Sequence, residues 1–350
     1  MLRAKSTGHI PADMQADKLL KWTTTLAALI LSFSEAQAQS FLKRIWTKTD
    51  SILTTRYYRT AYDTNYVVRP EGKLTLKLKA NLTGNSIHAK GTINDIHSKA
   101  DLSSRHKATI SIGASYCGIS ASYSINPAKF SGFYNDFEVN VNYYGRRLSI
   151  DASYLRTSSM SGNVERNGTM HRMEADDITM KVFNVVAYYC FNSRRFSFPA
   201  AFNQSYIQRR SAGSWLAGLS YQGGSIRTNE ELKARNPNAP DVTINVGHIG
   251  IGGGYGYNLV LGRKWLLHLS VLPTFVFYNR NDLTINNESR HAGRMRFNMI
   301  FNERAAVIYN ISPRYFVGAT LVMNNSLFDD KVVIVNQNKW IVHTLFGVRF

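Results

Sequence analysis

Strict alternation of apolar and polar residues is the feature that most limits what this chain can fold into. In residues 73–82, leucines at 74, 76, 78 and 82 alternate with lysine, threonine and asparagine. Because a strand points successive side chains to opposite faces, this period of two predicts β-strands. No comparable helical stretch follows about residue 60. The same alternation recurs in 107–116, 119–125, 137–143, 148–154 and 296–302.

The turns and the polar faces distinguish a transmembrane barrel from a soluble sandwich or barrel. Segments of roughly 9–14 residues suit tilted strands that cross a bilayer, with apolar residues toward lipid and polar residues toward the interior. The pattern favours an all-β fold, an antiparallel transmembrane β-barrel of about 12 strands within a range of roughly 10–14. Short turns at 117–118, 145–146, 262–263 and 312–313 alternate with long connections near 83–106, 156–178, 228–246, 279–294 and 325–338.

Aromatic residues near the predicted strand ends agree with this interpretation, because tyrosine and tryptophan form girdles at both membrane interfaces. The last segment, 340–350, ends in Phe350 and resembles the terminal strand by which bacterial outer-membrane barrels are recognised and inserted. The girdle candidates are Tyr116, Tyr143, Tyr154, Trp215, Trp265, Tyr278, Tyr315 and Trp340.

The beginning of the chain reads as an export signal. Lys18 and Lys21 precede the apolar run 22–33, which is followed by Ala36-Gln-Ala38. At about 12 residues this run is too short to span a bilayer, so residues 1–38 are predicted to be a secretory signal peptide cleaved after Ala38. The 17 residues before Lys18 are unusual for such a signal, which leaves Met1 and Met14 as alternative starts.

Residues 39–68 form a predicted lead-in segment, and residues 69–350 the barrel. Apolar residues from Phe41 to Leu53 follow an approximate helical spacing with basic residues between them. This predicts a short amino-terminal helix on the inner surface of the membrane, or a plug inside the barrel. A lead-in that only caps the barrel is the third alternative.

The chain is strongly basic, with 42 Lys and Arg against 23 Asp and Glu. No nucleic-acid motif accompanies this charge, so two other interpretations remain. Inward-facing cations would give a positive lumen that favours small anionic solutes. Cations near strand ends, such as Arg194, Arg195, Arg209 and Arg210, would instead pair with lipid phosphates. The candidate lumen residues are Lys73, Lys77, Lys79, Asp151, Arg296 and Asn298.

Signatures of soluble enzymes are absent, including G-x-S-x-G, H-E-x-x-H, C-x-x-C and the Walker loop. The glycines from 250 to 256 alternate within a predicted strand, which favours relief of barrel curvature over room for a ligand or plug. His268 and His343 lie in predicted strands, and nothing in the sequence pairs either with a nucleophile. We expect no cofactor and no metal site, and the spacing of Cys117 and Cys190 does not determine whether they pair.

Four stretches carry a family resemblance: 62–67, 116–127, 195–205 and 208–215. Together they are similar to a family of exported outer-membrane barrel proteins from Bacteroidota that is catalogued only as a domain of unknown function. The resemblance implies a location and a fold, and it brings no catalytic residue. Asp63, Asn65 and Tyr66 are the family-motif residues whose role stays open.

These patterns favour a monomeric outer-membrane protein, in contact with membrane lipid and lipopolysaccharide and without nucleic acid. The leading functional hypothesis is a passive small channel or envelope-binding barrel whose basic lumen favours anions. The alternative is a lipid-modifying hydrolase of the outer membrane, and the third hypothesis is a structural or assembly component of an envelope complex. The sequence favours a protein without catalytic activity but leaves the question open, as it does whether the lumen is open or plugged.

Overall fold

The computed structural model describes residues 35–59, 61–93, 96–117, 119–125, 136–291, 297–329 and 333–350. The chain divides into two units between residues 59 and 60. The described part of the first unit is one helix, α2 (Glu35–Arg59), as the predicted amino-terminal helix requires. Most of the predicted signal peptide, residues 1–34, lies outside the described part of the chain. Within the described ranges, no helix is long and apolar enough to cross a membrane.

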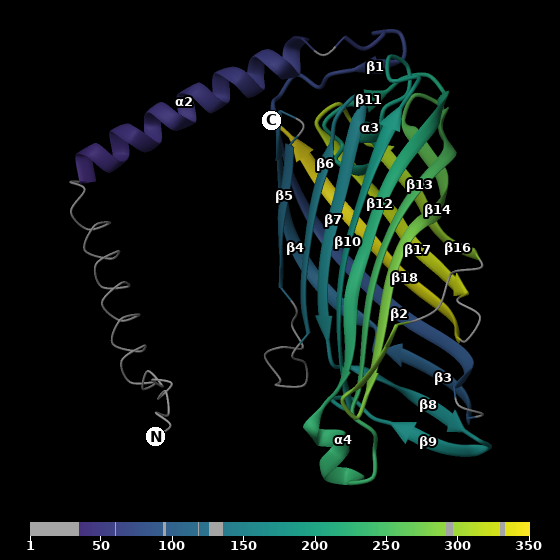
Figure 1. Cartoon of the computed structure of the whole chain (residues 1–350). Coiled ribbons are helices and arrows are strands. Elements are labelled where there is room, and N and C mark those ends of the chain that lie inside the picture. Colours follow the sequence, from purple (N-terminus) through teal and green to yellow (C-terminus); the bar gives the residue numbers. More distant parts are fainter. Residues whose placement is uncertain are drawn as a thin grey trace, which may run out of the picture. The chain divides into compact units, whose positions relative to one another are not determined.

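The second unit is a closed antiparallel barrel of 12 strands (Figure 1). Each strand pairs with the next along the chain, and β18 pairs with β2 from Val333↔Gly91 to Arg349↔Thr75 to close the ring. This confirms the predicted fold class and strand number. The barrel strands are β2 (Leu74–Ile93), β4 (Lys107–Tyr116), β5 (Ile119–Ile125), β6 (Phe137–Tyr144), β7 (Leu148–Thr157), β10 (Ile178–Cys190), β12 (Ala212–Thr228), β13 (Val242–Leu261), β14 (Trp265–Ile285), β16 (Phe297–Asn310), β17 (Tyr315–Asp329) and β18 (Val333–Arg349).

Short turns join neighbouring strands at the end of the barrel that holds the C-terminus, and longer structure lies at the other end (Figure 1). Much of what the sequence suggested as long polar connections is strand: β2 has 20 residues and β14 has 21. Outside a bilayer the ladder of hydrogen bonds continues while both faces become polar, so the alternating signal fades. The added elements at that end are β3 (Ile96–Ser104), β8 (Met160–Arg166), β9 (Thr169–Met173), α4 (Glu230–Arg235) and β15 (Glu288–His291).

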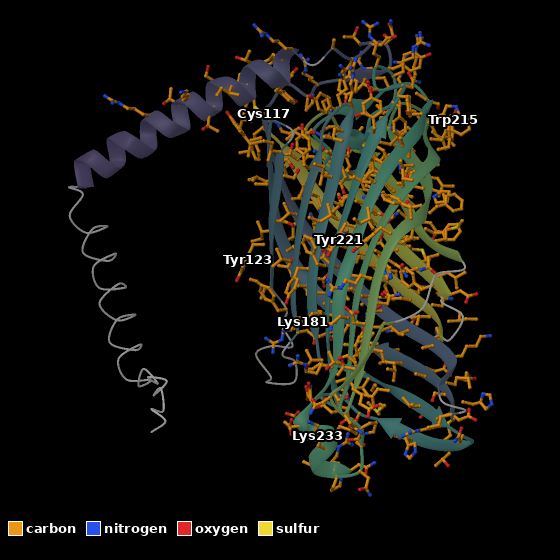
Figure 2. The ribbon with its side chains drawn as sticks, in the orientation of Figure 1. Cys117, Tyr123, Lys181, Trp215, Tyr221 and Lys233 are labelled. Atoms are coloured by element: carbon orange, nitrogen blue, oxygen red, sulfur yellow. The ribbon has the colours of Figure 1, made fainter. Side chains whose placement is uncertain are left out.

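The barrel wall is apolar outside and polar inside. On β12, Leu219 is 54% exposed while the adjacent Ser220 is 1% exposed, and on β2 Leu78 and Lys77 alternate in the same way. Exposed aromatic side chains contact one another near the short-turn end, with ring centroids 5.2 Å apart for Trp215 and Tyr255. Trp215 lies on the outer face of the wall (Figure 2). This is the arrangement expected of a surface that meets lipid.

The connection between β10 and β12 folds into the bore instead of turning back at its edge. We name residues 191–211 the plug segment; it contains α3 (Phe198–Phe202) and β11 (Ile207–Gln208), which pairs with β1 (Val67–Val68). Phe196 and Phe198 are fully buried and pack against the inner faces of β10, β12 and β14. A core of buried apolar side chains therefore lies inside the barrel, at the short-turn end.

Candidate functional site

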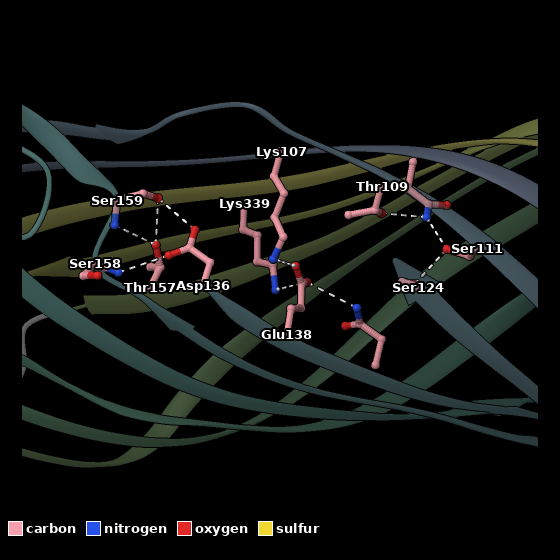
Figure 3. Close-up of polar contacts among 12 residues, drawn as sticks. Lys107, Thr109, Ser111, Ser124, Asp136, Glu138, Thr157, Ser158, Ser159 and Lys339 are labelled. Atoms are coloured by element: carbon pink, nitrogen blue, oxygen red, sulfur yellow. Dashed lines mark hydrogen bonds and ion pairs between the residues drawn. The ribbon is translucent and has the colours of Figure 1, made fainter. Parts of the chain in front are cut away.

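On the side of the plug segment away from the short-turn end, the lumen contains a cavity of about 560 Å³, which we name the chamber. This volume lies in the range of roughly 300–1,000 Å³ that is typical of sites for small ligands. Polar side chains from the inner faces of most strands line it, and Figure 3 shows one part of them. The charged residues in its lining are Lys79, Lys107, Arg304, Lys339, Asp136, Glu138 and Asp151.

Glu138 lies between two lysines (Figure 3). Its carboxylate is 3.2 Å from Lys339 Nζ and 4.0 Å from Lys107 Nζ, and it accepts a hydrogen bond from Asn140 Nδ2 at 3.2 Å. The strands β6 and β18 are not neighbours in the ring, since β5, β4 and β2 separate them. The contact of Glu138 with Lys339 therefore reaches across the lumen, and this group of three carries an excess positive charge.

A row of hydrogen bonds follows the wall beside these lysines. His343 Nδ1 and Asn81 Oδ1 are 2.7 Å apart, and Asn81 Nδ2 donates to Thr109 and Ser111. Ser111 Oγ in turn lies 2.7 Å from Ser124 Oγ. Lys79 lines the chamber next to this row, and it forms no hydrogen bond or ion pair with any residue in the described ranges.

The floor of the chamber is built around Arg304, which is 3% exposed. Its guanidinium pairs with Asp151 and donates to the hydroxyl oxygens of Tyr144 and Tyr188, each at 3.1 Å. Because Arg304 is on β16 and Asp151 is on β7, this ion pair also crosses the bore. The ring of Phe202, from α3, lies 5.5 Å below the guanidinium, so the floor rests on the plug segment.

The structure separates the candidate lumen residues that the sequence grouped together. Lys79 and Asp151 both line the chamber. Lys77 does not line it: its Nζ donates to Asn203 O at 3.0 Å, inside the plug segment. Asn298, which is 4% exposed, accepts from the main-chain nitrogen of Asp329, and Lys73 precedes β2 at the short-turn end. Arg296 lies outside the described residues.

The family-motif residues have a structural role that the sequence left open. Asp63 accepts a hydrogen bond from the main-chain nitrogen of Asn65 at 3.1 Å, and its carboxylate is 3.6 Å from Arg195 Nε. The Arg195 guanidinium lies 5.0 Å from the centre of the Tyr66 ring. Two stretches about 130 residues apart are thus in contact: residues 63–66 bind the start of the plug segment through an ion pair and a cation–π contact.

A further polar cluster lies between the plug segment and the inner faces of β13 and β14. The sequence predicted no site there. His268 Nε2 is 2.9 Å from Ser270 Oγ, and its Nδ1 is 2.7 Å from Asn258 Oδ1. The i, i+2 spacing of His268 and Ser270 on one strand was the available signal, since such residues share a face. All three side chains are at most 3% exposed. Phe196, Phe198 and Phe202 lie against the imidazole ring.

Glu138 and Lys339 were not among the predicted site residues, although alternation places Glu138 on a polar face. Neither residue alone indicates a site in the sequence, because their contact depends on which strands face each other across the ring. Cys117 and Cys190 do not form a disulfide. In the described part of the chain, no three His, Cys, Asp or Glu side chains come together as a metal site would require.

A closed antiparallel ring with an apolar exterior and a polar interior is the architecture of outer-membrane β-barrels. Within that class, the family model described as Domain of unknown function (DUF4421) matches residues 61–350, and the chain belongs to this family. Membership in a domain-of-unknown-function family with a barrel fold is what the sequence resemblance implied.

Solved barrels from several bacteria are similar to this chain in fold alone. The outer membrane protease OmpT from Escherichia coli shares 9% identity, with 80% of this chain and 97% of that chain covered and a TM-score of 0.42. The translocator domain of the autotransporter NalP from Neisseria meningitidis shares 7% identity, with 90% of this chain and 98% of that chain covered and a TM-score of 0.28. The P. putida toluene transporter TodX shares 8% identity, with 80% of this chain and 91% of that chain covered and a TM-score of 0.26. No curated protein matches the chain.

Proposed function

We propose that this protein is an outer-membrane barrel whose closed chamber binds a small anionic group, rather than an open channel. The observation that carries the proposal is Lys79, a lumen-facing cation that lines the chamber without a partner in the described ranges. The described lining holds four cationic side chains and three carboxylates. A polar site with surplus positive charge, partly shielded from water, attracts anions.

Contacts across the bore support a closed lumen. The plug segment fills the short-turn end, and the ion pair of Arg304 with Asp151 spans the bore directly above it. Toward the other end, Gln222 on β12 donates to Gln337 on β18 at 3.2 Å, again between strands that are not neighbours. A solute would have to break these contacts to pass, which favours binding over conduction.

Titration with inorganic phosphate tests the proposal. The purified barrel in phosphatidylcholine nanodiscs is titrated by calorimetry at low ionic strength, where electrostatic attraction is least screened. Lys79→Gln should weaken binding about fivefold or more. Lys181→Gln, on an exposed position of β10, is the matched control and should leave the affinity unchanged. Equal affinity in Lys79→Gln and the unmodified chain, or steady conductance steps in planar bilayers, would overturn the closed anion-binding chamber.

We infer that the barrel is a monomer in the outer membrane of a Gram-negative bacterium of the Bacteroidota. Its apolar exterior supports contact with lipid and lipopolysaccharide. Short turns face the periplasm in such barrels, and here that end carries exposed cations where phosphates of the inner leaflet would lie. These cations are Arg147, Arg209, Arg210, Arg263, Lys264 and Arg314.

Export through a signal peptide cleaved after Ala38 belongs to the same proposal. The cleavage position falls inside α2, near its first turn. Mass spectrometry of the protein purified from outer membranes should find a chain that begins at Gln39. A mature chain that retains residues 14–38 would contradict the cleavage.

The cluster of Ser270, His268 and Asn258 favours hydrolysis of lipid as a second candidate function. A serine hydroxyl within 2.9 Å of an imidazole whose other nitrogen is held by an acceptor is the arrangement of an activated nucleophile. Arg304 is opposite Ser270 in the register of β14 and β16, and its guanidinium is held by Asp151, Tyr144 and Tyr188. Because α3 covers the cluster, activity would require this helix to move.

A fluorophosphonate probe separates this candidate from a purely structural role. Covalent labelling of the folded barrel, lost in Ser270→Ala and retained in Ser220→Ala, would support the hydrolase. Ser220 is a suitable control because it is an equally buried serine on β12 with no histidine hydrogen bond. Absence of labelling in the presence of a lipid bilayer would leave the cluster as the support on which the plug segment rests.

A further inference from the structure

The seam between β5 and β6 differs from its neighbours in the barrel wall. The strands β4 and β5 pair from Ile110↔Ile125 to Tyr116↔Ile119, and β6 and β7 pair from Phe137↔Arg156 to Tyr144↔Ser149. Within the described ranges, β5 and β6 pair only at Ile119↔Tyr143, near the short-turn end. Among the described residues, the facing edges of β5 and β6 do not pair with each other beyond this point. Residues 126–135, which connect the two strands, lie outside the described part of the chain.

An unpaired seam in a membrane wall is costly unless something polar fills it. Unsatisfied backbone N–H and C=O groups are tolerated at membrane depth only where they line a water-filled or occupied cavity. The outer faces of both strands are apolar and exposed, with Tyr123 75% and Val141 61% exposed. Figure 2 shows Tyr123 directed away from the barrel, toward the region that lipid would occupy.

The chamber extends into this seam. Its lining includes inward-facing polar residues of β5 and β6, such as Ser124 and Glu138, and also Tyr123, Phe137 and Val139 from their outer faces. A cavity lined by both faces of the same two strands passes through the wall. Its inner end is polar and carries the surplus positive charge, whereas its outer end is apolar.

We propose that the gap between β5 and β6 is a lateral portal, through which a single-chain anionic amphiphile from the membrane places its head group in the chamber beside Lys79 while its alkyl chain stays in the bilayer. This rests on the proposed anion-binding chamber. Charge complementarity selects the head group, and the apolar outer rim selects the chain. The volume of about 560 Å³ is large enough for one such head group.

Dodecyl phosphate and inorganic phosphate form the matched pair of probes, because they share the anionic group and differ in the alkyl chain. Binding is measured by calorimetry to the full chain in phosphatidylcholine nanodiscs, with empty nanodiscs subtracted. Dodecyl phosphate should bind about tenfold or more tightly than inorganic phosphate, since burial of the chain at the rim adds to the shared contact. Dodecyltrimethylammonium, which has the same chain and the opposite charge, should not compete.

A charge on the outer rim tests the route. Tyr123→Glu should weaken binding of dodecyl phosphate about tenfold, because a carboxylate at the rim is unfavourable beside a buried alkyl chain, and should leave inorganic phosphate, which makes no contact at the rim, unchanged. Tyr221→Glu, at an exposed position on the outer face of β12, is the matched control and should affect neither probe. Val139→Trp, on the outer face of β6, narrows the gap without a change of charge and keeps the test valid if Tyr123→Glu does not fold.

The outcomes separate the portal from the chamber. If inorganic phosphate binds through Lys79 but dodecyl phosphate binds no more tightly, the portal is wrong and the chamber stands. Unchanged binding of dodecyl phosphate in Tyr123→Glu or Val139→Trp also overturns the portal, as does a stable dimer formed by pairing of two β5 or β6 edges. If neither probe binds, the chamber itself is wrong.

Discussion

The side-chain nitrogen of Lys77, on β2, donates a hydrogen bond to the main-chain oxygen of Asn203 at 3.0 Å, so this lysine anchors the plug segment. Arg349, at the end of β18, donates from Nε to the main-chain oxygen of Gln204, which follows Asn203, at 3.0 Å. The strands β2 and β18 are the first and last of the barrel and pair with each other. Closure of the ring therefore brings together two cations that hydrogen-bond to the main chain of the plug segment.

Lys77→Met should loosen this segment, because the carbonyl oxygen of Asn203 would be left buried without its charged donor. Loss of a hydrogen bond to a charged group costs about 1.5–3 kcal/mol. Chemical unfolding of the barrel in lipid vesicles measures the free energy, and proteolysis within residues 191–211 should become faster. Lys181→Met, at an exposed site, should change neither; an equal effect of the two substitutions would contradict the anchoring role.

The ion pair of Arg304 with Asp151 should behave as a coupled unit. Arg304→Met or Asp151→Leu alone leaves an uncompensated charge in the bore and should cost about 3–5 kcal/mol of unfolding free energy. The double variant should cost much less than the sum of the two, because no unpaired charge remains. A double-mutant cycle of unfolding in lipid vesicles measures the coupling. Additive effects would show that the two side chains do not interact.

Gly254→Ala should destabilise the barrel by about 1–3 kcal/mol. A Cβ at this inward-facing position would lie 2.0 Å from the main-chain oxygen of Val271 on the adjacent strand, so the two strands would have to separate. Gly253→Ala is the control, since its nearest neighbour would be 3.9 Å away. Melting of the heat-modifiable band on gels compares the two. Equal melting temperatures would remove the curvature explanation of the glycine stripe.

Leu219→Arg should lower the free energy of unfolding markedly if the outer face of β12 contacts lipid. Arginine on the lipid face of a barrel costs about 2–4 kcal/mol near the bilayer midplane. Ala234→Arg, on an exposed position of α4 outside the barrel wall, should cost almost nothing. Folding yield into vesicles and the free energy of unfolding report the difference. A tolerated arginine at position 219 would place this face outside the membrane.

Alternation in the sequence predicted which side chains face lipid and which face the lumen, as Leu78, which is exposed, and Lys77, which is buried, illustrate. It could not say what the lumen residues contact. Lys77 and Lys79 occupy the same face of one strand, yet one anchors the plug segment and the other lines the chamber. The difference comes from residues about 130 positions away, whose path into the bore has no periodic signal.

Alternation along the chain is enough to predict a β-barrel with an apolar exterior, because a strand turns successive side chains to opposite environments. The plugged bore, the contact of Glu138 with Lys339 across it, and the single described pairing of β5 and β6 depend instead on how distant segments come together. These are contacts between strands that are distant in sequence, set by ring closure and by a connection that folds inward. The role of each basic residue therefore follows from where the closed ring places it: at the plug segment, in the chamber or at the rim.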